Sequence, residues 1–170
     1  MKNVIRKFLL VALTVPLLLS SCKDEDEQID LGAQVSGTYD YKIELYVENG
    51  SQLEYMGTDY DQIGTAVVSK TSTGIEMKEG GEVQLRASKL TAASNGVTFD
   101  IESQVVNVDG QDIIVEGYDG VDLSGVRYNG LYETASRELT GYMQFQGIYT
   151  DANGDSYEAT FVMEITATKI

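Results

Sequence analysis

The chain has 170 residues, and its 27 acidic and 12 basic side chains give a formal net charge of −15. This charge argues against nucleic acid, anionic lipid and anionic glycans as partners, and it suits cations or neutral and basic partners. The sequence has no His and one Cys, which excludes His-based acyl-transfer triads, a His-based zinc site and an intramolecular disulfide.

The first 21 residues are predicted to be a signal peptide. Lys2, Arg6 and Lys7 precede an apolar stretch of 12 residues, from Phe8 to Leu19. That stretch is short for a transmembrane helix, which needs roughly 20 apolar residues, and it has the usual length for the core of a signal. Removal of residues 1–21 takes away three positive charges and no acid, so the net charge becomes −18.

Cys22 is predicted to be a lipidation site. The four residues Leu19-Ser20-Ser21-Cys22 resemble the bacterial lipobox, which implies cleavage before Cys22 and several acyl chains on it. The alternative is an ordinary secretory signal followed by a chance cysteine.

An acidic run follows Cys22 and consists of Lys23, Asp24, Glu25, Asp26 and Glu27. It resembles the export signal of surface-exposed lipoproteins of the Bacteroidota, which implies an anchored protein of the outer membrane that faces outward. The alternative is a solvated, self-repelling tether. Residues 22–34 are therefore assigned to the lipidated Cys and its tether, and residues 35–170 to one domain.

Period-two alternation predicts strands along the whole domain. The clearest lies over 38–48, where the odd-numbered apolar side chains from Tyr39 to Val47 face inward. Asn-Gly or Asp-Gly turns occur six times and separate further alternating segments. Strands are predicted over 65–70, 75–78, 82–87, 97–105, 112–118, 131–136, 138–150 and from 157 almost to the end of the chain. Segments 51–64 and 121–128 have weak patterns and are interpreted as short strands or loops.

These features predict an all-β fold, namely an antiparallel up-and-down β-barrel of about eight strands, with a β-sandwich as the alternative. The motif Gly37-Thr38-Tyr39 opens the first strand where lipocalins carry Gly-x-Trp. With the signal, the tether and a last strand at the very end, the chain resembles the lipocalin-like (calycin-like) lipoproteins of the Bacteroidota. The resemblance implies that the first and last strands pair and that a ligand enters at one open end.

The inward side chains are the candidate lining of a cavity: Tyr39, Tyr41, Phe99, Ile101, Phe145, Phe161 and Met163. An eight-stranded interior either holds one small ligand or is filled by such side chains. The expected function is non-catalytic binding of an unknown small ligand. The alternative is a structural or interaction module of an envelope complex, with function on its loops and an envelope protein as its partner.

Three further sets of residues are weaker candidates. Asp151, Asn153 and Asp155 resemble a calcium loop, although a hairpin turn uses the same residue types, and the turn is the favoured interpretation. Carboxylate pairs for glycoside hydrolysis are Asp59 with Asp61 and Asp119 with Asp122, which nothing distinguishes from solvated loop acids. Sugar-stacking tyrosines are Tyr46, Tyr142 and Tyr60, although Tyr is also a common strand residue. No enzyme activity, cofactor or metal is expected.

Overall fold

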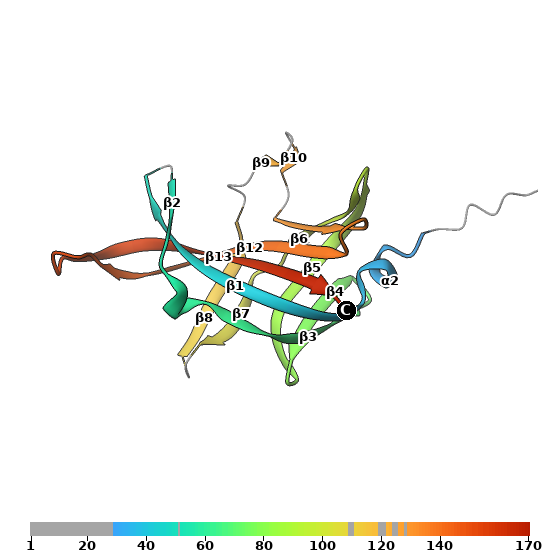
Figure 1. Cartoon of the computed structure of the whole chain (residues 1–170), viewed down its shortest axis with the longest axis horizontal. Coiled ribbons are helices and arrows are strands. Elements are labelled where there is room, and N and C mark those ends of the chain that lie inside the picture. The colour runs from blue at the N-terminus through green and yellow to red at the C-terminus, as the bar shows by residue number, and fades with distance from the viewer. Residues whose placement is uncertain (1–28, 51, 109–110, 119–121, 124–125, 128) are drawn as a thin grey trace, which may run out of the picture.

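A computed structural model describes residues 29–50, 52–108, 111–118, 122–123, 126–127 and 129–170. In this part of the chain, the main body is a closed antiparallel β-barrel of eight strands, compatible with a lipocalin-like fold. The strands follow one another around the barrel in chain order, and the last pairs with the first (Figure 1). They are β1 (Gly37–Asn49), β3 (Gln62–Lys70), β4 (Gly74–Glu79), β5 (Glu82–Ala93), β6 (Gly96–Ile101), β11 (Gly130–Glu133), β12 (Glu138–Thr150) and β13 (Ser156–Lys169).

The prediction of an all-β up-and-down barrel is therefore confirmed. Closure runs through the pairing of β1 with β13, in which Tyr39 lies opposite Lys169 and Val47 opposite Phe161. On the other side of β13, β12 pairs with it over the full hairpin, from Glu138–Thr168 to Thr150–Ser156. Because both edges of the sheet are joined, the barrel body exposes no long unpaired edge.

One end of the barrel is filled by apolar side chains and covered by a short helix, α2 (Leu31–Val35). Its last residue, Val35, is fully buried among barrel side chains, and the hydroxyl of Tyr39 donates a hydrogen bond to the Val35 carbonyl. Asp30 caps the helix by accepting a hydrogen bond from the Ala33 amide at 3.0 Å. Among the described residues, no helix has the length and apolar character needed to cross a membrane.

The folded part extends further toward the N-terminus than the predicted boundary at residue 35. The helix α2 has five residues, little more than one turn, so its sequence cannot display a helical period. What holds it is tertiary contact: Val35 in the core, and an ion pair of 2.7 Å between Asp30 and Lys70.

At the opposite end, the wall of the barrel spreads open. β12 pairs with β11 as far as Gly141. Beyond that point its partner is β8 (Gln111–Gly117), which pairs with Met143 and Gln144. β8 forms a hairpin with β7 (Gln104–Val108). On the other flank, β1 leaves β3 after Ile43 and pairs instead with β2 (Gln52–Tyr55), which the 3-10 helix η1 (Thr58–Tyr60) connects to β3.

Figure 1 shows the two ends: α2 and the C-terminus lie at one, and β2 with the tip of the β12–β13 hairpin lies at the other. We call them the α2 end and the open end. The small hairpin of β9 (Asp122–Leu123) and β10 (Val126–Arg127) lies in the connection from β8 to β11, within the segment predicted as strand or loop.

The prediction of one continuous strand over 97–105 is wrong. β6 ends at Ile101 and β7 begins at Gln104, so the chain breaks at Glu102 and Ser103. The break reverses the alternation: Val106 is buried, and Val105, which the pattern places inside, is 58% exposed. The sequence hides this because Val105 and Val106 are both apolar and fit either parity.

Candidate binding groove at the open end

Two adjoining hollows at the open end form one concave surface, which we call the mouth groove. The outer hollow measures about 500 Å³ and the inner about 310 Å³, and Leu45 and Tyr60 line both. The outer hollow is also lined by Val47, Glu54, Tyr55, Met56, Ile148, Tyr149, Thr150 and Phe161. The inner hollow is also lined by Ile43, Asp59, Asp61, Gln62, Ile113, Phe145 and Met163.

The floor of the groove exists because β1, β12 and β13 continue past the closed part of the barrel. Their register places Leu45 opposite Met163, and Phe161 opposite both Val47 and Phe145. The rings of Phe145 and Phe161 stack with centroids 5.1 Å apart and planes 12° apart. The floor is therefore an apolar, partly aromatic surface supported by three long strands.

The β2–η1 arm forms one wall, and polar contacts hold it in place. The Met56 amide donates a hydrogen bond of 2.9 Å to the Leu45 carbonyl, which fastens the arm to β1. Asp61 accepts a hydrogen bond of 2.7 Å from the Tyr55 hydroxyl and pairs with Lys42 at 3.1 Å. The Tyr55 bond, with the contribution of Lys42, holds the pKa of Asp61 below its ordinary value.

The same bond has the reverse effect on its donor. The charged Asp61 beside it raises the pKa of Tyr55 to about 12, so the phenol stays neutral at physiological pH. Tyr55 is 42% exposed and Tyr60 is 53% exposed, and both line the outer hollow.

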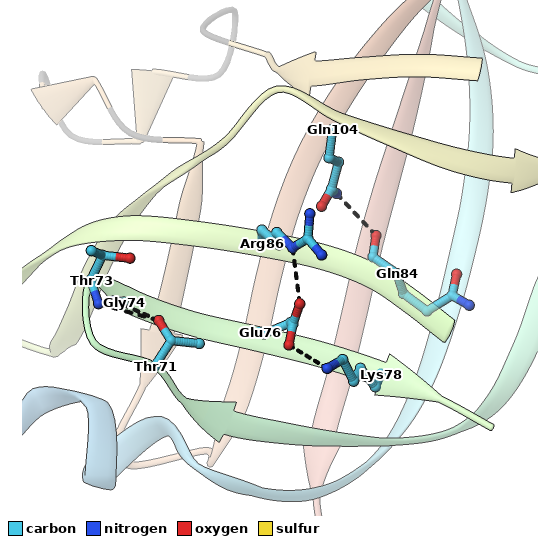
Figure 2. Close-up of polar contacts among 8 residues, drawn as sticks. All are labelled: Thr71, Thr73, Gly74, Glu76, Lys78, Gln84, Arg86 and Gln104. Carbon is cyan, nitrogen blue, oxygen red and sulfur yellow. Dashed lines mark hydrogen bonds and ion pairs between the residues drawn. The ribbon is translucent and has the colours of Figure 1, made fainter. Parts of the chain in front are cut away.

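The β7–β8 hairpin forms the opposite wall. Ile113 faces the inner hollow, and its neighbours Val106 and Val115 are buried in the barrel core. Figure 2 shows how the hairpin is tied to β5: the buried Gln104 side chain donates a hydrogen bond of 3.2 Å to the Gln84 carbonyl. The Gln104 Oε1 atom has no hydrogen-bond partner among the described residues.

Figure 2 also shows the outer face of β4 and β5 beneath this tie. Glu76 pairs with Lys78 at 2.5 Å and with Arg86 at 2.9 Å. These two cations, Lys78 first, hold the pKa of Glu76 below its ordinary value. Lys78 of β4 and Arg86 of β5 are thus engaged on the outside of the barrel, and neither lines the groove.

The predicted lining residues divide into two groups. Phe145, Phe161 and Met163 do line the mouth groove. Tyr39, Tyr41, Phe99 and Ile101 instead belong to the packed core, where each is at most 6% exposed. For these four, the interpretation as cavity lining is corrected to core packing.

The burial of Tyr41 has a visible effect on its chemistry. Its hydroxyl donates a hydrogen bond to Glu79, and burial together with this acid raises the pKa of Tyr41 to about 12. The closed part of the barrel is therefore filled by side chains, and the hollow surface lies at the open end, beyond the closed part.

Several groove residues were not predicted from the sequence. Some of them lie in a clear alternation pattern, and others do not. Leu45 and Tyr149 have the inward parity of their strands, so the alternation already marked them as inward side chains. Met56 lies in the weakly patterned segment 51–64, and Ile113 belongs to an inserted hairpin. No period could have placed these two in the groove, because long-range pairing positions them. Tyr60, named from the sequence as a candidate for sugar stacking, does line both hollows.

The Asp151 loop is built as a hairpin turn. The carboxylate of Asp151 accepts hydrogen bonds from the amides of Asn153 at 2.9 Å and Asp155 at 3.0 Å. These bonds, the Asp155 amide first, hold the pKa of Asp151 below its ordinary value. In the described part of the chain, no three Asp, Glu, His or Cys side chains are grouped as a metal site would require.

The remaining candidates are dispersed. Asp59 and Asp61 both line the inner hollow. Tyr46 packs against Tyr55 with ring centroids 5.6 Å apart, and the Tyr142 hydroxyl donates to Glu164 at 3.1 Å. Cys22, residues 23–27 and Asp119 lie outside the described residues, as does the side chain of Asp122.

The groove thus combines an apolar aromatic floor, two walls held by hydrogen bonds and a rim that contains carboxylates. Comparison of the chain with protein-family models, with curated proteins and with solved structures finds no match to any of them.

Proposed function

We propose that this chain is a non-catalytic binding protein whose mouth groove holds a small, partly apolar ligand. One observation carries the proposal: the open end of the barrel is a concave site with an apolar floor and a few polar groups at its rim. Small-molecule sites in proteins typically have volumes of about 300 to 1,000 Å³ and this composition. The two hollows, of about 500 and 310 Å³, suit one small molecule.

We further propose that Cys22 anchors the protein by acyl chains to the outer membrane, facing the cell exterior. The lipobox-like residues before Cys22 and the acidic run after it support this. Membership of the lipocalin-like lipoproteins is proposed on the same residues, on Gly37-Thr38-Tyr39 and on the barrel fold.

Native mass spectrometry tests the binding proposal. The full chain carrying Cys22→Ser is incubated with extracts of its host's envelope and growth medium and then sprayed intact. The expected result is a reproducible added mass, which Leu45→Arg abolishes because it places a charged side chain on the groove floor.

The matched control is Val67→Arg, since Val67 lies on the outer wall and is 50% exposed. This variant should retain the added mass. A bare protein mass at every extract concentration would contradict the proposal.

A second candidate function is that of an interaction module, and one observation favours it. Val105 and Ile114 are cross-strand partners on the outside of the β7–β8 hairpin, 58% and 70% exposed. Apolar side chains paired on an outer face are typical of contact surfaces. Crosslinking on whole cells tests it. A protein partner that is lost in Ile114→Asp but retained in Ile63→Asp, at a 79% exposed position on β3 outside the groove lining, would support this function.

A further inference from the structure

We propose that the ligand of the mouth groove is an amphipathic cation: an alkylammonium head lies in the outer hollow, and its apolar part lies over the inner hollow. This inference rests on the proposed function and names the chemical class of its ligand. It follows from three properties of the lining, namely its charge, its aromatic rings and the continuity of the two hollows.

The first property is charge. The described lining residues include Glu54, Asp59 and Asp61 and no Lys or Arg. Asp61 is engaged by Lys42 and Tyr55, which leaves Glu54 and Asp59 as carboxylates without an ion pair in the described chain. A head in the outer hollow faces Glu54, and Asp59 lies in the inner hollow next to Tyr60, which lines both. An anionic head would meet like charges there, and a cationic head would meet the opposite sign.

The distribution of basic residues strengthens this asymmetry. Lys70 pairs with Asp30 beside α2, and the Lys169 ammonium donates to the Gln34 carbonyl at 3.0 Å, so both lie at the α2 end. Lys42 pairs with Glu44 at 2.6 Å and with Asp61 at 3.1 Å, so two carboxylates share its charge. Acidic side chains thus outnumber basic ones in and around the groove, which favours the approach of a cation.

The second property is aromatic surface. Tyr55, Tyr60, Tyr149 and Phe161 all line the outer hollow. Alkylammonium groups bind over the faces of aromatic rings because the ring quadrupole attracts a poorly hydrated cation. Tyr149 also meets the Phe161 ring edge-on, with centroids 6.5 Å apart and planes at 65°, so the two rings present different orientations.

Tyr55 adds to this effect. Its hydroxyl donates to the Asp61 carboxylate, which pushes electron density toward the ring and strengthens its attraction for a cation. A sugar would instead need a set of neutral hydrogen-bond donors and acceptors. The floor offers Leu45, Val47 and Met56, which suit methyl and methylene groups.

The third property is continuity. Leu45 and Tyr60 line both hollows, so a molecule whose head lies in the outer hollow can extend without interruption into the inner one. There it meets Ile113, Phe145 and Met163, which are apolar and suit an alkyl or ring-shaped body. The unbranched Met163 side chain can adapt to the shape of that body. The site therefore fits a molecule with a cationic end and an apolar end.

Isothermal titration calorimetry with three probes of equal chain length tests the inference. Decyltrimethylammonium, decanoate and decyl maltoside are titrated, each below its micelle-forming concentration, into the full chain carrying Cys22→Ser at low salt. The expected order is the cation first, about tenfold tighter than the neutral probe, with the carboxylate weakest. Added salt should reduce the preference for the cation.

Variants identify the residues responsible. The pair Glu54→Gln with Asp59→Asn, and separately Tyr60→Leu, should each weaken decyltrimethylammonium several fold more than it weakens decyl maltoside. The control is Glu158→Gln, an exposed acid of β13 outside the groove lining. It removes the same kind of charge from the chain and should leave all three affinities unchanged.

The outcomes separate the two proposals. Equal affinity for the three probes, or tighter binding of decanoate, would overturn the cation inference and leave the groove as a binding site. Binding of none of the probes, with an adduct still acquired from extracts, would overturn it as well. Binding of none of them, with no adduct from extracts, would overturn the proposed function too.

Discussion

The division of the barrel into a packed half and an open half predicts that two leucines of inward parity respond differently to truncation. Leu85 is fully buried in the core cluster, whereas Leu45 is partly exposed and lines both hollows of the mouth groove. Leu85→Ala leaves a cavity that surrounding side chains cannot fill, so it should lower the free energy of unfolding by about 3–5 kcal/mol. Leu45→Ala removes methyl groups that already face a hollow open to solvent. This variant loses only part of the hydrophobic transfer free energy of the Leu45 side chain, so it should lower the free energy of unfolding by about 1 kcal/mol.

Urea unfolding measures both values. The chain has 11 Tyr and no Trp, so tyrosine fluorescence and far-ultraviolet circular dichroism report the transition. A shift of the midpoint without a change in slope is expected for each variant. A loss at Leu45 as large as that at Leu85 would mean that the open end is packed as tightly as the core, and the groove would then be refuted as a binding site.

Three other perturbations test the fold. Gly74→Ala would place a β-carbon 1.9 Å from the Ala87 carbonyl oxygen, so it should lower the free energy of unfolding in urea by about 3 kcal/mol or more. Gly50→Ala meets no atom within 4 Å and should lower it by about 1–2 kcal/mol, because residue 50 has a positive φ. Val35→Ala should lower the unfolding free energy by about 2 kcal/mol if α2 is part of the folded unit, and Ile29→Ala, at a 65% exposed position, should change it by less than about 0.5 kcal/mol. Burial, with the hydrogen bond to Glu79, raises the pKa of Tyr41 to about 12 from 10.0, so the native state keeps a proton that the unfolded state loses. The free energy of unfolding should therefore fall as pH rises from 10 to 12, and in Tyr41→Phe it should fall less steeply over the same range. If the urea midpoint of the variant has the same slope against pH as that of the unchanged chain, the raised pKa of Tyr41 is contradicted.

The sequence predicted those parts of the fold that depend on alternation over a long strand. β1, β12 and β13 carry period-two patterns along most of their length, and their inward side chains, such as Ile43, Met143 and Ile165, are buried as expected. Val162 of β13 is the exception, since it has outer parity and is fully buried. Alternation specifies the face of a side chain but not its height along the barrel axis. For this reason the pattern could not separate Phe99, in the packed half, from Phe161, in the open half.

The positions of the β2–η1 arm and the β7–β8 hairpin could not be predicted from the sequence, for a different reason. β2 and η1 carry too few apolar residues to show a period, and they are positioned by β1 and by the contacts of Asp61 with Tyr55 and Lys42. The helix α2 is a further case, since its five residues are stabilised by contacts distant in sequence. Where local propensity is weak, tertiary contacts decide the structure.

The chain enters the barrel beside α2, and the mouth groove lies at the other end. Ile29 lies seven positions after Cys22, so an acyl anchor on Cys22 would keep Ile29 within about 25 Å of the bilayer surface. The barrel would then stand between its anchor and its own binding site. In that arrangement the groove faces away from the lipid, and a ligand would reach it through the surrounding water. The rate of loading would depend on the free concentration of the ligand in the medium, and the protein would act as a collector from solution rather than as an extractor from the membrane.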